Sequence, residues 1–203
     1  MGKGLDRTLT GFVMFFVRHW LAILIALVVL FTAPIVVVPF LESTNILILK
    51  QLSELVFHLY GGPVCHQLPE RSLFIFGYQM TVCSRCFAIY AAFLAGCILF
   101  AFVRTKLKPW SIIYFILLCV PMAIDGTTQL FGIEIPRRIG SGWELIWIAE
   151  STNELRIITG AIFGLAGALY VLPFLQAIFN GDEGPAPGVK VVQPDNSQGP
   201  ASK

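Results

Sequence analysis

Charged residues are scarce in this chain, and their scarcity sets the class of protein. Only 13% of the 203 residues are Asp, Glu, Lys or Arg, whereas 56% are hydrophobic, and the mean hydropathy is +0.77. A soluble domain is normally about one-quarter charged. So little charge cannot cover a water-exposed surface, and the sequence therefore predicts an integral membrane protein. The small net charge of +2, without a basic stripe, excludes a nucleic-acid partner.

Four apolar stretches are long enough to span a bilayer. They cover residues 20–41, 86–103, 110–130 and 157–179. The first is too long for the apolar region of a signal peptide, and no small-residue cleavage site closes it, so we expect a retained anchor. Between Ile46 and Tyr60, apolar residues recur at helical spacing, which predicts an amphipathic helix at the membrane interface. The predicted fold is an all-α integral membrane protein with four transmembrane helices plus this interfacial helix.

Basic residues near the span ends predict the orientation in the membrane. They gather in an N-terminal arm, residues 1–19, and in the link between the second and third spans, so both segments should be cytoplasmic. Residues 180–203 are rich in Gly, Pro, Ser and Asn and should form a disordered cytoplasmic tail. We expect a multi-pass protein of the cell membrane with both termini cytoplasmic and residues 20–179 as its membrane domain. The basic residues are Lys3, Arg7, Arg18, Arg104, Lys106 and Lys108.

A cluster of cysteine and histidine lies in the link before the second span, on the predicted outer side. Cys65 and His66 precede Cys83 and Cys86 by fewer than twenty residues, so the chain can return to bring all four together. Three thiolates and one imidazole form a closed set of the kind that binds structural zinc. Soft sulfur ligands also suit iron–sulfur or copper(I) centres. We therefore expect a zinc-type site on the outer face.

Thiol redox chemistry is the alternative for the same cysteines, because disulfides persist outside the cytoplasm. Quinone-linked thiol oxidases also carry Cys-x-x-Cys at the outer end of a membrane helix. Cys83 would then be the nucleophile, Arg85 would favour its thiolate, Cys65 would resolve the disulfide, and a membrane quinone would be the cofactor. Those oxidases carry a second cysteine pair in a later outer link, whereas residues 131–154 contain no cysteine. A third possibility is that the cysteines only pack against the helices.

Polar residues inside the third and fourth spans predict a pocket beneath the cluster. Asp125 and Gln129 share one face of the third span, and Asn153 and Arg156 share one face of the fourth. An ionisable group inside a span normally faces the bundle interior with a partner, so we expect Asp125 to pair with Arg156. The pair either orients the two helices or belongs to a catalytic pocket, with Asp125 as a general base or proton carrier.

An anionic, lipid-like molecule is the substrate that such a pocket would suit. Asp125 and Arg156 would be its catalytic residues, and Arg71, Gln129 and Asn153 would bind the substrate. The third class of function is an accessory subunit, which would bind other membrane subunits and carry no chemistry of its own. In each case the lipid bilayer is a partner.

Four motifs together resemble a known family. The chain is similar to a family of small polytopic prokaryotic membrane proteins classed as a domain of unknown function, over about Gly62 to Gly164. The resemblance implies a membrane protein with these residues as motif positions, and it implies no particular reaction. The motifs are Cys65-His66-Gln67-x-Pro69-x-Arg71-Ser72, Cys83-x-Arg85-Cys86, Asp125-Gly126-x-x-Gln129 and Glu150-Ser151-x-Asn153-x-x-Arg156.

Overall fold

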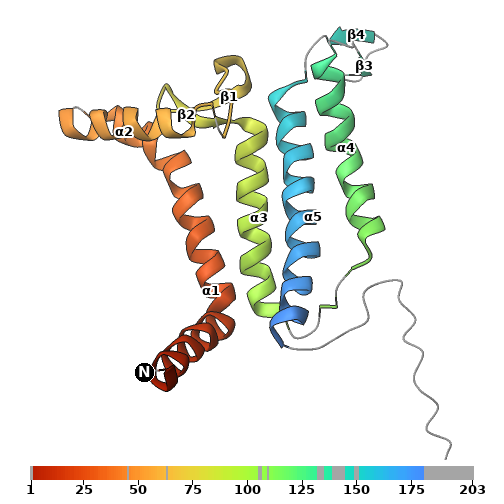
Figure 1. The fold of residues 1–203 in the computed structure, drawn as a ribbon. Coiled ribbons are helices and arrows are strands. Elements are labelled where there is room, and N and C mark those ends of the chain that lie inside the picture. Colours follow the sequence, from red (N-terminus) through yellow and green to blue (C-terminus); the bar gives the residue numbers. More distant parts are fainter. Residues whose placement is uncertain are drawn as a thin grey trace, which may run out of the picture.

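The computed structural model is mostly helical (Figure 1). The residues that it describes are 2–44, 46–62, 64–104, 107–108, 110–131, 135–138, 145–148 and 151–180. The helices are α1 (Gly2–Ser43), α2 (Leu47–Tyr60), α3 (Ser84–Val103), α4 (Ile112–Leu130) and α5 (Asn153–Asn180), with a short 3-10 helix η1 (Pro69–Arg71). The strands are β1 (Ser72–Ile75), β2 (Tyr78–Cys83), β3 (Ile135–Arg138) and β4 (Leu145–Ile148).

In the part of the chain that the structure describes, three helices are long and apolar enough to cross a membrane, which confirms the predicted class of protein. They are Leu9–Ser43 of α1, the whole of α3, and Asn153–Phe179 of α5, while α4 is a shorter apolar helix. The helices α1, α3 and α5 run side by side in sequence order, and α4 packs on α5 (Figure 1). Helix α1 also includes most of the predicted N-terminal arm. The predicted tail, from residue 181 onward, lies outside the described residues.

Two short antiparallel hairpins correct the all-α prediction. β1 pairs with β2, and β3 pairs with β4. Phe76 and Gly77 join the first pair with φ angles of 54° and 83°, the positive values that a tight two-residue hairpin turn requires. Met80, Thr81 and Val82 of β2 are all buried, so this strand lacks the alternation of polar and apolar residues that would have revealed it.

Small residues let α3 and α5 approach at backbone distance. A Cβ atom placed on Gly164 would lie 2.2 Å from the carbonyl oxygen of Ile89, and one on Gly160 would lie 2.6 Å from that of Arg85. Such contacts are common where membrane helices associate, because little hydrophobic force acts between helices in lipid. This seam fixes the first turns of α3 and α5 next to each other, which is where the candidate site lies.

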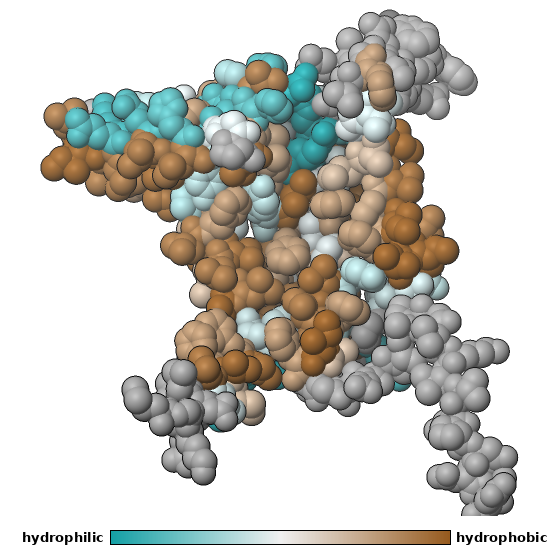
Figure 2. Space-filling view, viewed as in Figure 1, coloured by the Kyte–Doolittle hydropathy of each residue, from teal (hydrophilic) through white to brown (hydrophobic). Residues whose placement is uncertain are grey.

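Helix α2 lies across the end of the bundle instead of along it (Figure 1). Figure 2 shows a hydrophilic face on its upper side and a hydrophobic face on its lower side, toward the apolar flanks of the other helices. Ile48, Leu55 and Leu59 on this helix are 74%, 58% and 63% exposed. At its C-terminal end, the Tyr60 hydroxyl donates a hydrogen bond to the carbonyl of Phe31 in α1, which ties the two helices together.

Candidate functional site

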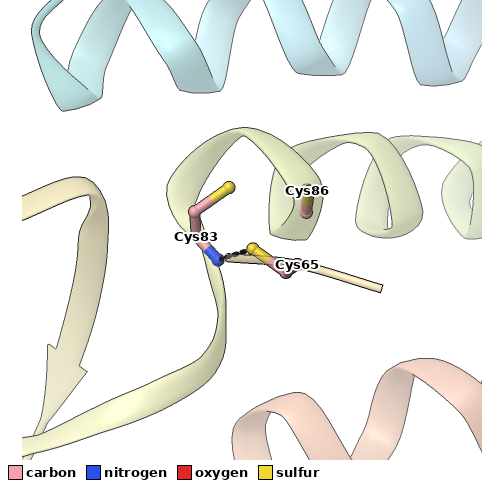
Figure 3. Close-up of side chains that lie close together, drawn as sticks. All are labelled: Cys65, Cys83 and Cys86. Carbon is pink, nitrogen blue, oxygen red and sulfur yellow. Dashed lines mark hydrogen bonds between the residues drawn. The ribbon is translucent and has the colours of Figure 1, made fainter. Parts of the chain in front are cut away.

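The three outer cysteines meet at one point. Cys65 follows α2, Cys83 ends β2, and Cys86 lies in the first turn of α3 (Figure 3). Their sulfur atoms all lie within 4.8 Å of one another, and each is a free thiol. A tetrahedral ion with zinc–sulfur bonds of about 2.3 Å would hold its sulfurs roughly 3.8 Å apart. The group can therefore hold a metal ion after a contraction of at most about 1 Å.

A tight loop after α2 brings Cys65 to the cluster. The amide of Cys65 donates to the carbonyl of Tyr60 at 3.1 Å, and the amide of Gly62 donates to the carbonyl of Cys65 at 3.2 Å. Gly62 has a φ angle of 74°, in the left-handed region that glycine adopts without steric cost. The loop thus folds back on the end of α2 and presents the sulfur of Cys65 to the start of α3.

Hydrogen bonds of Gln67 hold this loop against α2 and the hairpin, a role that its sequence position alone does not reveal. Its side-chain amide donates to the carbonyls of Phe57 in α2 and Thr81 in β2, each at 2.7 Å. Gln79 in turn donates to the carbonyl of Gln67 at 2.7 Å. Gln67 has a positive φ of 50°, a conformation that is uncommon outside glycine and that these bonds hold in place. The signal in the sequence was its position directly after Cys65-His66.

Cys65 is the hydrogen-bond acceptor of the cluster. The backbone amide of Cys83 donates to its sulfur at 3.2 Å (Figure 3). Hydrogen bonds from the thiols of Cys83 and Cys86 hold the pKa of Cys65 well below its usual range, against the opposing effect of burial. Amide donors of Gln67 and Cys83 act in the same direction. Because the thiolate is the form that binds metals and attacks disulfides, Cys65 is prepared for either chemistry.

His66 does not join the three sulfurs, so the predicted set of four ligands is only partly assembled. Among the described His, Cys, Asp and Glu residues, the group of ligand atoms contains the three cysteines and excludes His66. Its side chain is exposed and lines a cavity beside the cluster.

Three arginines line this cavity, whose volume is about 240 Å³. Arg71 ends η1, Arg85 lies in the first turn of α3, and Arg156 lies in the first turn of α5. Two helices, α3 and α5, begin here, and the N-terminal end of each carries a partial positive charge. Three basic side chains and two helix N-termini therefore meet at this cavity. The lining residues are Val64, Cys65, His66, Gln67, Leu68, Arg71, Cys83, Arg85, Cys86 and Arg156.

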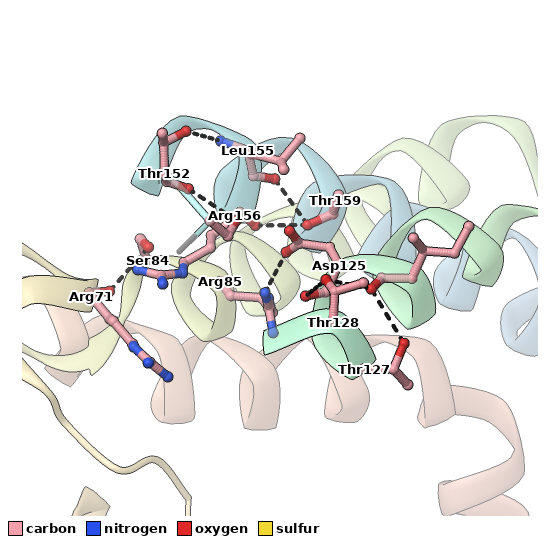
Figure 4. A network of polar contacts seen from close by, with 12 residues as sticks. Arg71, Ser84, Arg85, Asp125, Thr127, Thr128, Thr152, Leu155, Arg156 and Thr159 are labelled. Atoms are coloured by element: carbon pink, nitrogen blue, oxygen red, sulfur yellow. Dashed lines mark hydrogen bonds and ion pairs between the residues drawn. The ribbon is translucent and has the colours of Figure 1, made fainter. Parts of the chain in front are cut away.

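Asp125 of α4 forms an ion pair with Arg85 in the first turn of α3 (Figure 4). The side chains of Asp125 and Arg85 are 3% and 21% exposed, so the pair is largely removed from water. In the prediction from sequence, Arg156 is the partner of Asp125, and Arg85 favours the thiolate of Cys83 only in the redox alternative. The rotation of α3 against α4, which aims Arg85 at Asp125, cannot be read from the sequence. An interaction of Asp125 with Arg156 stays a prediction.

Asn153 and Ser84 join the arginines to the backbone around the cavity. The Ser84 hydroxyl lies 3.0 Å from the carbonyl oxygen of Arg71 and 3.0 Å from Oδ1 of Asn153. Nη1 of Arg156 donates to the same Oδ1 at 3.2 Å. Asn153, predicted to bind substrate, thus holds η1, α3 and α5 together at the rim. Gln129 belongs to α4, but its side chain lies outside the described part of the chain.

Comparison with known proteins gives a family match and two curated relatives. The family described as "Predicted membrane protein (DUF2085)" matches residues 65–170, which include every predicted site residue. An uncharacterized protein of Methanocaldococcus jannaschii is 37% identical over 170 residues, covering 80% of this chain and 96% of that one. Another, from Methanothermobacter thermautotrophicus, is 33% identical over 114 residues, covering 55% of this chain and 89% of that one. No solved structure matches.

Proposed function

The chain belongs to the DUF2085 family of membrane proteins. We propose that it carries a zinc-type metal centre at Cys65, Cys83 and Cys86, and that the adjoining cavity takes an anionic, lipid-like substrate. The observation that carries this proposal is the approach of three sulfur atoms to within 4.8 Å.

The proposed arrangement in the membrane has four spans, with α4 as the third in order. Its 19 residues reach roughly 28 Å at 1.5 Å per residue, close to the thickness of the hydrocarbon core of about 30 Å. Helix α2 would lie in the interface, with its exposed apolar side chains in lipid. Arg104 and Lys108 lie beyond the opposite end of α3. Because basic residues are enriched on the cytoplasmic side, they support an orientation in which that end is cytoplasmic and the cysteines lie outside.

Three thiolates leave a metal ion with a further ligand position, as in catalytic zinc sites. His66 lines the same cavity and would fill that position in a closed, structural site. In an open site, a water molecule or a substrate oxygen would fill it. The amide of Cys83 that donates to the sulfur of Cys65 would act as an outer-shell hydrogen bond that orients this ligand.

Within the cavity, Arg71 and Arg156 would hold the anionic group of the substrate. Asp125 would act as a general base or proton carrier, oriented by its ion pair with Arg85. Asn153 and Gln129 would supply further polar contacts. The three cysteines line the same cavity, and the metal centre is therefore tested first.

Elemental analysis together with mass-spectrometric thiol counting tests the metal centre. The protein would be purified in detergent under reducing and non-reducing conditions. We expect about one zinc-type ion per chain, lost in Cys83→Ser and retained in the control Cys119→Ser, whose thiol lies within α4. Absence of metal from the wild-type protein in both the reducing and the non-reducing preparation would rule the proposal out.

A thiol–disulfide oxidoreductase is the second candidate, and two observations favour it. Cys83 occupies the N-cap position of α3 and Cys86 lies in the first turn, an arrangement common among redox-active thiols. An apolar cavity of about 380 Å³ between α1 and α3 reaches Tyr90, one turn beyond Cys86, and has room for a quinone ring. Two thiols would form a disulfide and pass two electrons and two protons to the quinone. A reducible disulfide in metal-free protein would make quinone reduction the next assay.

A further inference from the structure

One threonine of α1 differs from the threonines of α4 and α5. Thr127, Thr128 and Thr159 each donate the side-chain hydroxyl to the carbonyl one turn earlier, at 2.7, 2.9 and 2.9 Å. Thr32 is only 7% exposed, and its hydroxyl oxygen has no hydrogen-bond partner among the described residues. A buried hydroxyl without a partner is costly, which points to an oxygen outside the chain that accepts from it.

Thr32 lines the apolar cavity of about 380 Å³ between α1 and α3. This volume lies within the range of roughly 300–1,000 Å³ that small-molecule pockets occupy, and a polar group among apolar side chains is usual for such pockets. Leu27 and Phe31, which also line it, are 58% and 37% exposed, so the cavity opens on the apolar flank of the helices. A ligand would therefore enter from the bilayer. The other lining residues are Val28, Ile89, Tyr90 and Phe93.

The aromatic side chains of this cavity favour a flat ring. Phe31, Tyr90 and Phe93 line it, and the rings of Phe31 and Tyr90 meet edge to face with centroids 4.9 Å apart. Aromatic rings pack well against another flat ring at centroid distances of about 4.5–7 Å. Among the described residues that line the cavity none is charged, so nothing there pairs with a phospholipid headgroup. The ligand that fits is a neutral, flat ring that carries a carbonyl oxygen.

The cavity begins one helical turn from the cysteine cluster. Tyr90 follows Cys86 by four residues in α3, so both lie on one face of the helix, about 6 Å apart along its axis. Cys86 and Tyr90 also pack against the same hydrophobic cluster, which includes Cys65 and Tyr60. A ring in the cavity would therefore lie next to the residues that surround the three sulfur atoms.

We infer that the cavity between α1 and α3 binds the ring of a membrane quinone, and that the Thr32 hydroxyl donates a hydrogen bond to one carbonyl of this ring. Phe31, Tyr90 and Phe93 pack against the ring, and its apolar tail extends past Leu27 into lipid. The choice of a quinone rests on the second candidate function, whereas the requirement for a neutral ring with a carbonyl oxygen rests on the cavity. The inference deepens that function because it identifies the side chain that binds the ring.

Calorimetric titration of the protein in maltoside micelles tests the inference. The probe is a decylquinone whose ring positions are all substituted, so that thiols cannot add to it, and protein-free micelles give the blank. Thr32→Val nearly keeps the size of the side chain and should weaken binding about fivefold, the effect of one hydrogen bond between neutral groups. Phe93→Leu should weaken binding about threefold or more, because it removes a ring contact. Thr127→Val, whose hydroxyl is used within α4, is the matched control and should bind like the wild type.

The thermal midpoint of each variant gives a second readout. Without quinone, Thr32→Val should raise the midpoint, because it removes a buried donor that lacks a partner, whereas Thr127→Val should not raise it. Saturating quinone should raise the midpoint of the wild type by more than that of Thr32→Val. If Phe93→Leu does not fold, Thr32→Val and its control still decide the question.

Equal quinone affinity in the wild type and Thr32→Val, or a lower midpoint of Thr32→Val without quinone, would overturn the inference. Dioctanoylglycerol, a neutral lipid with ester carbonyls and no ring, is the second probe, and binding as tight as that of the quinone would remove the need for a ring and also overturn it.

The inference and the second candidate function can fail separately. A reducible disulfide among the three cysteines, without saturable quinone binding, would overturn the inference and leave the oxidoreductase standing. Quinone binding that depends on Thr32, in a protein whose cysteines hold metal and form no disulfide, would support the cavity and reject the oxidoreductase.

Discussion

Replacing Asp125 with Asn should destabilise the protein strongly, because it leaves Arg85 without its counter-charge. The Asp125 side chain is 3% exposed and that of Arg85 is 21% exposed. Breaking a buried ion pair by neutralising one partner typically costs about 3–5 kcal/mol. Since water reaches part of Arg85, we expect the lower end of this range, about 3 kcal/mol, which corresponds to roughly a hundredfold change in the unfolding equilibrium.

The double variant Asp125→Asn with Arg85→Gln separates the ion pair from other contacts. It removes both charges and lets two amides hydrogen-bond, so it should be more stable than Asp125→Asn alone. The coupling energy between the two positions should be about 1–3 kcal/mol. Glu70→Gln, an exposed carboxylate on η1, is the control and should leave stability unchanged.

Equilibrium unfolding in mixed micelles, followed by the helical circular dichroism signal, measures these differences. A loss below about 1 kcal/mol in Asp125→Asn would show that the pair does not have the buried character described above. Additive effects of the two single substitutions would refute the direct interaction of Asp125 with Arg85. Lipid binding by the folded Asp125→Asn variant then tells whether the pair also serves the cavity.

Three further substitutions test how the site is supported. Gly164→Ala would place a Cβ 2.2 Å from the carbonyl oxygen of Ile89, so α3 and α5 must separate. The thermal midpoint should fall by an amount equivalent to about 3 kcal/mol or more. Gly11→Ala is the control and should not lower the midpoint, because its added Cβ meets nothing within 4 Å. Gln67→Ala removes two hydrogen bonds of the Gln67 side chain, one to α2 and one to β2, and should cost about 2 kcal/mol in the same unfolding assay. Tyr60→Phe removes one donor to a carbonyl of α1 and should cost about 1 kcal/mol, and an unchanged midpoint would contradict this bond.

The membrane class, the main helices and the three cysteines could be predicted from the sequence. Long apolar runs identify spans directly, because the bilayer requires a fixed length of apolar chain. The motif Cys83-x-x-Cys86 could be placed at a helix start because Ser84 and Arg85 directly precede a long apolar run. A short return from Cys65 was then enough to bring the third sulfur close.

The partner of Asp125 and the position of His66 could not be predicted in the same way. The partner of Asp125 depends on the rotation of α3 relative to α4, and no local pattern in either helix reports this rotation. The position of His66 depends on the path of the loop between α2 and η1. The hairpin of β1 and β2 was missed for another reason. Its second strand is buried on both faces, which removes the alternation that marks a strand in sequence.

The glycine seam between α3 and α5 has a mechanical consequence for the cysteine site. Because the two backbones touch at Gly160 and Gly164, they form one stiff block that carries Cys86 and Arg156 at a fixed spacing. Cys65 sits outside this block, on a loop fastened to α2 and through it to α1, whose interior contains Pro34 and Pro39 and therefore lacks two backbone hydrogen bonds. The same loop is also held to β2 by the hydrogen bond from Gln67 to the carbonyl of Thr81, and β2 leads directly into α3. The position of Cys65 relative to Cys86 therefore depends on hydrogen bonds, whereas the spacing of Cys86 and Arg156 depends on backbones in contact.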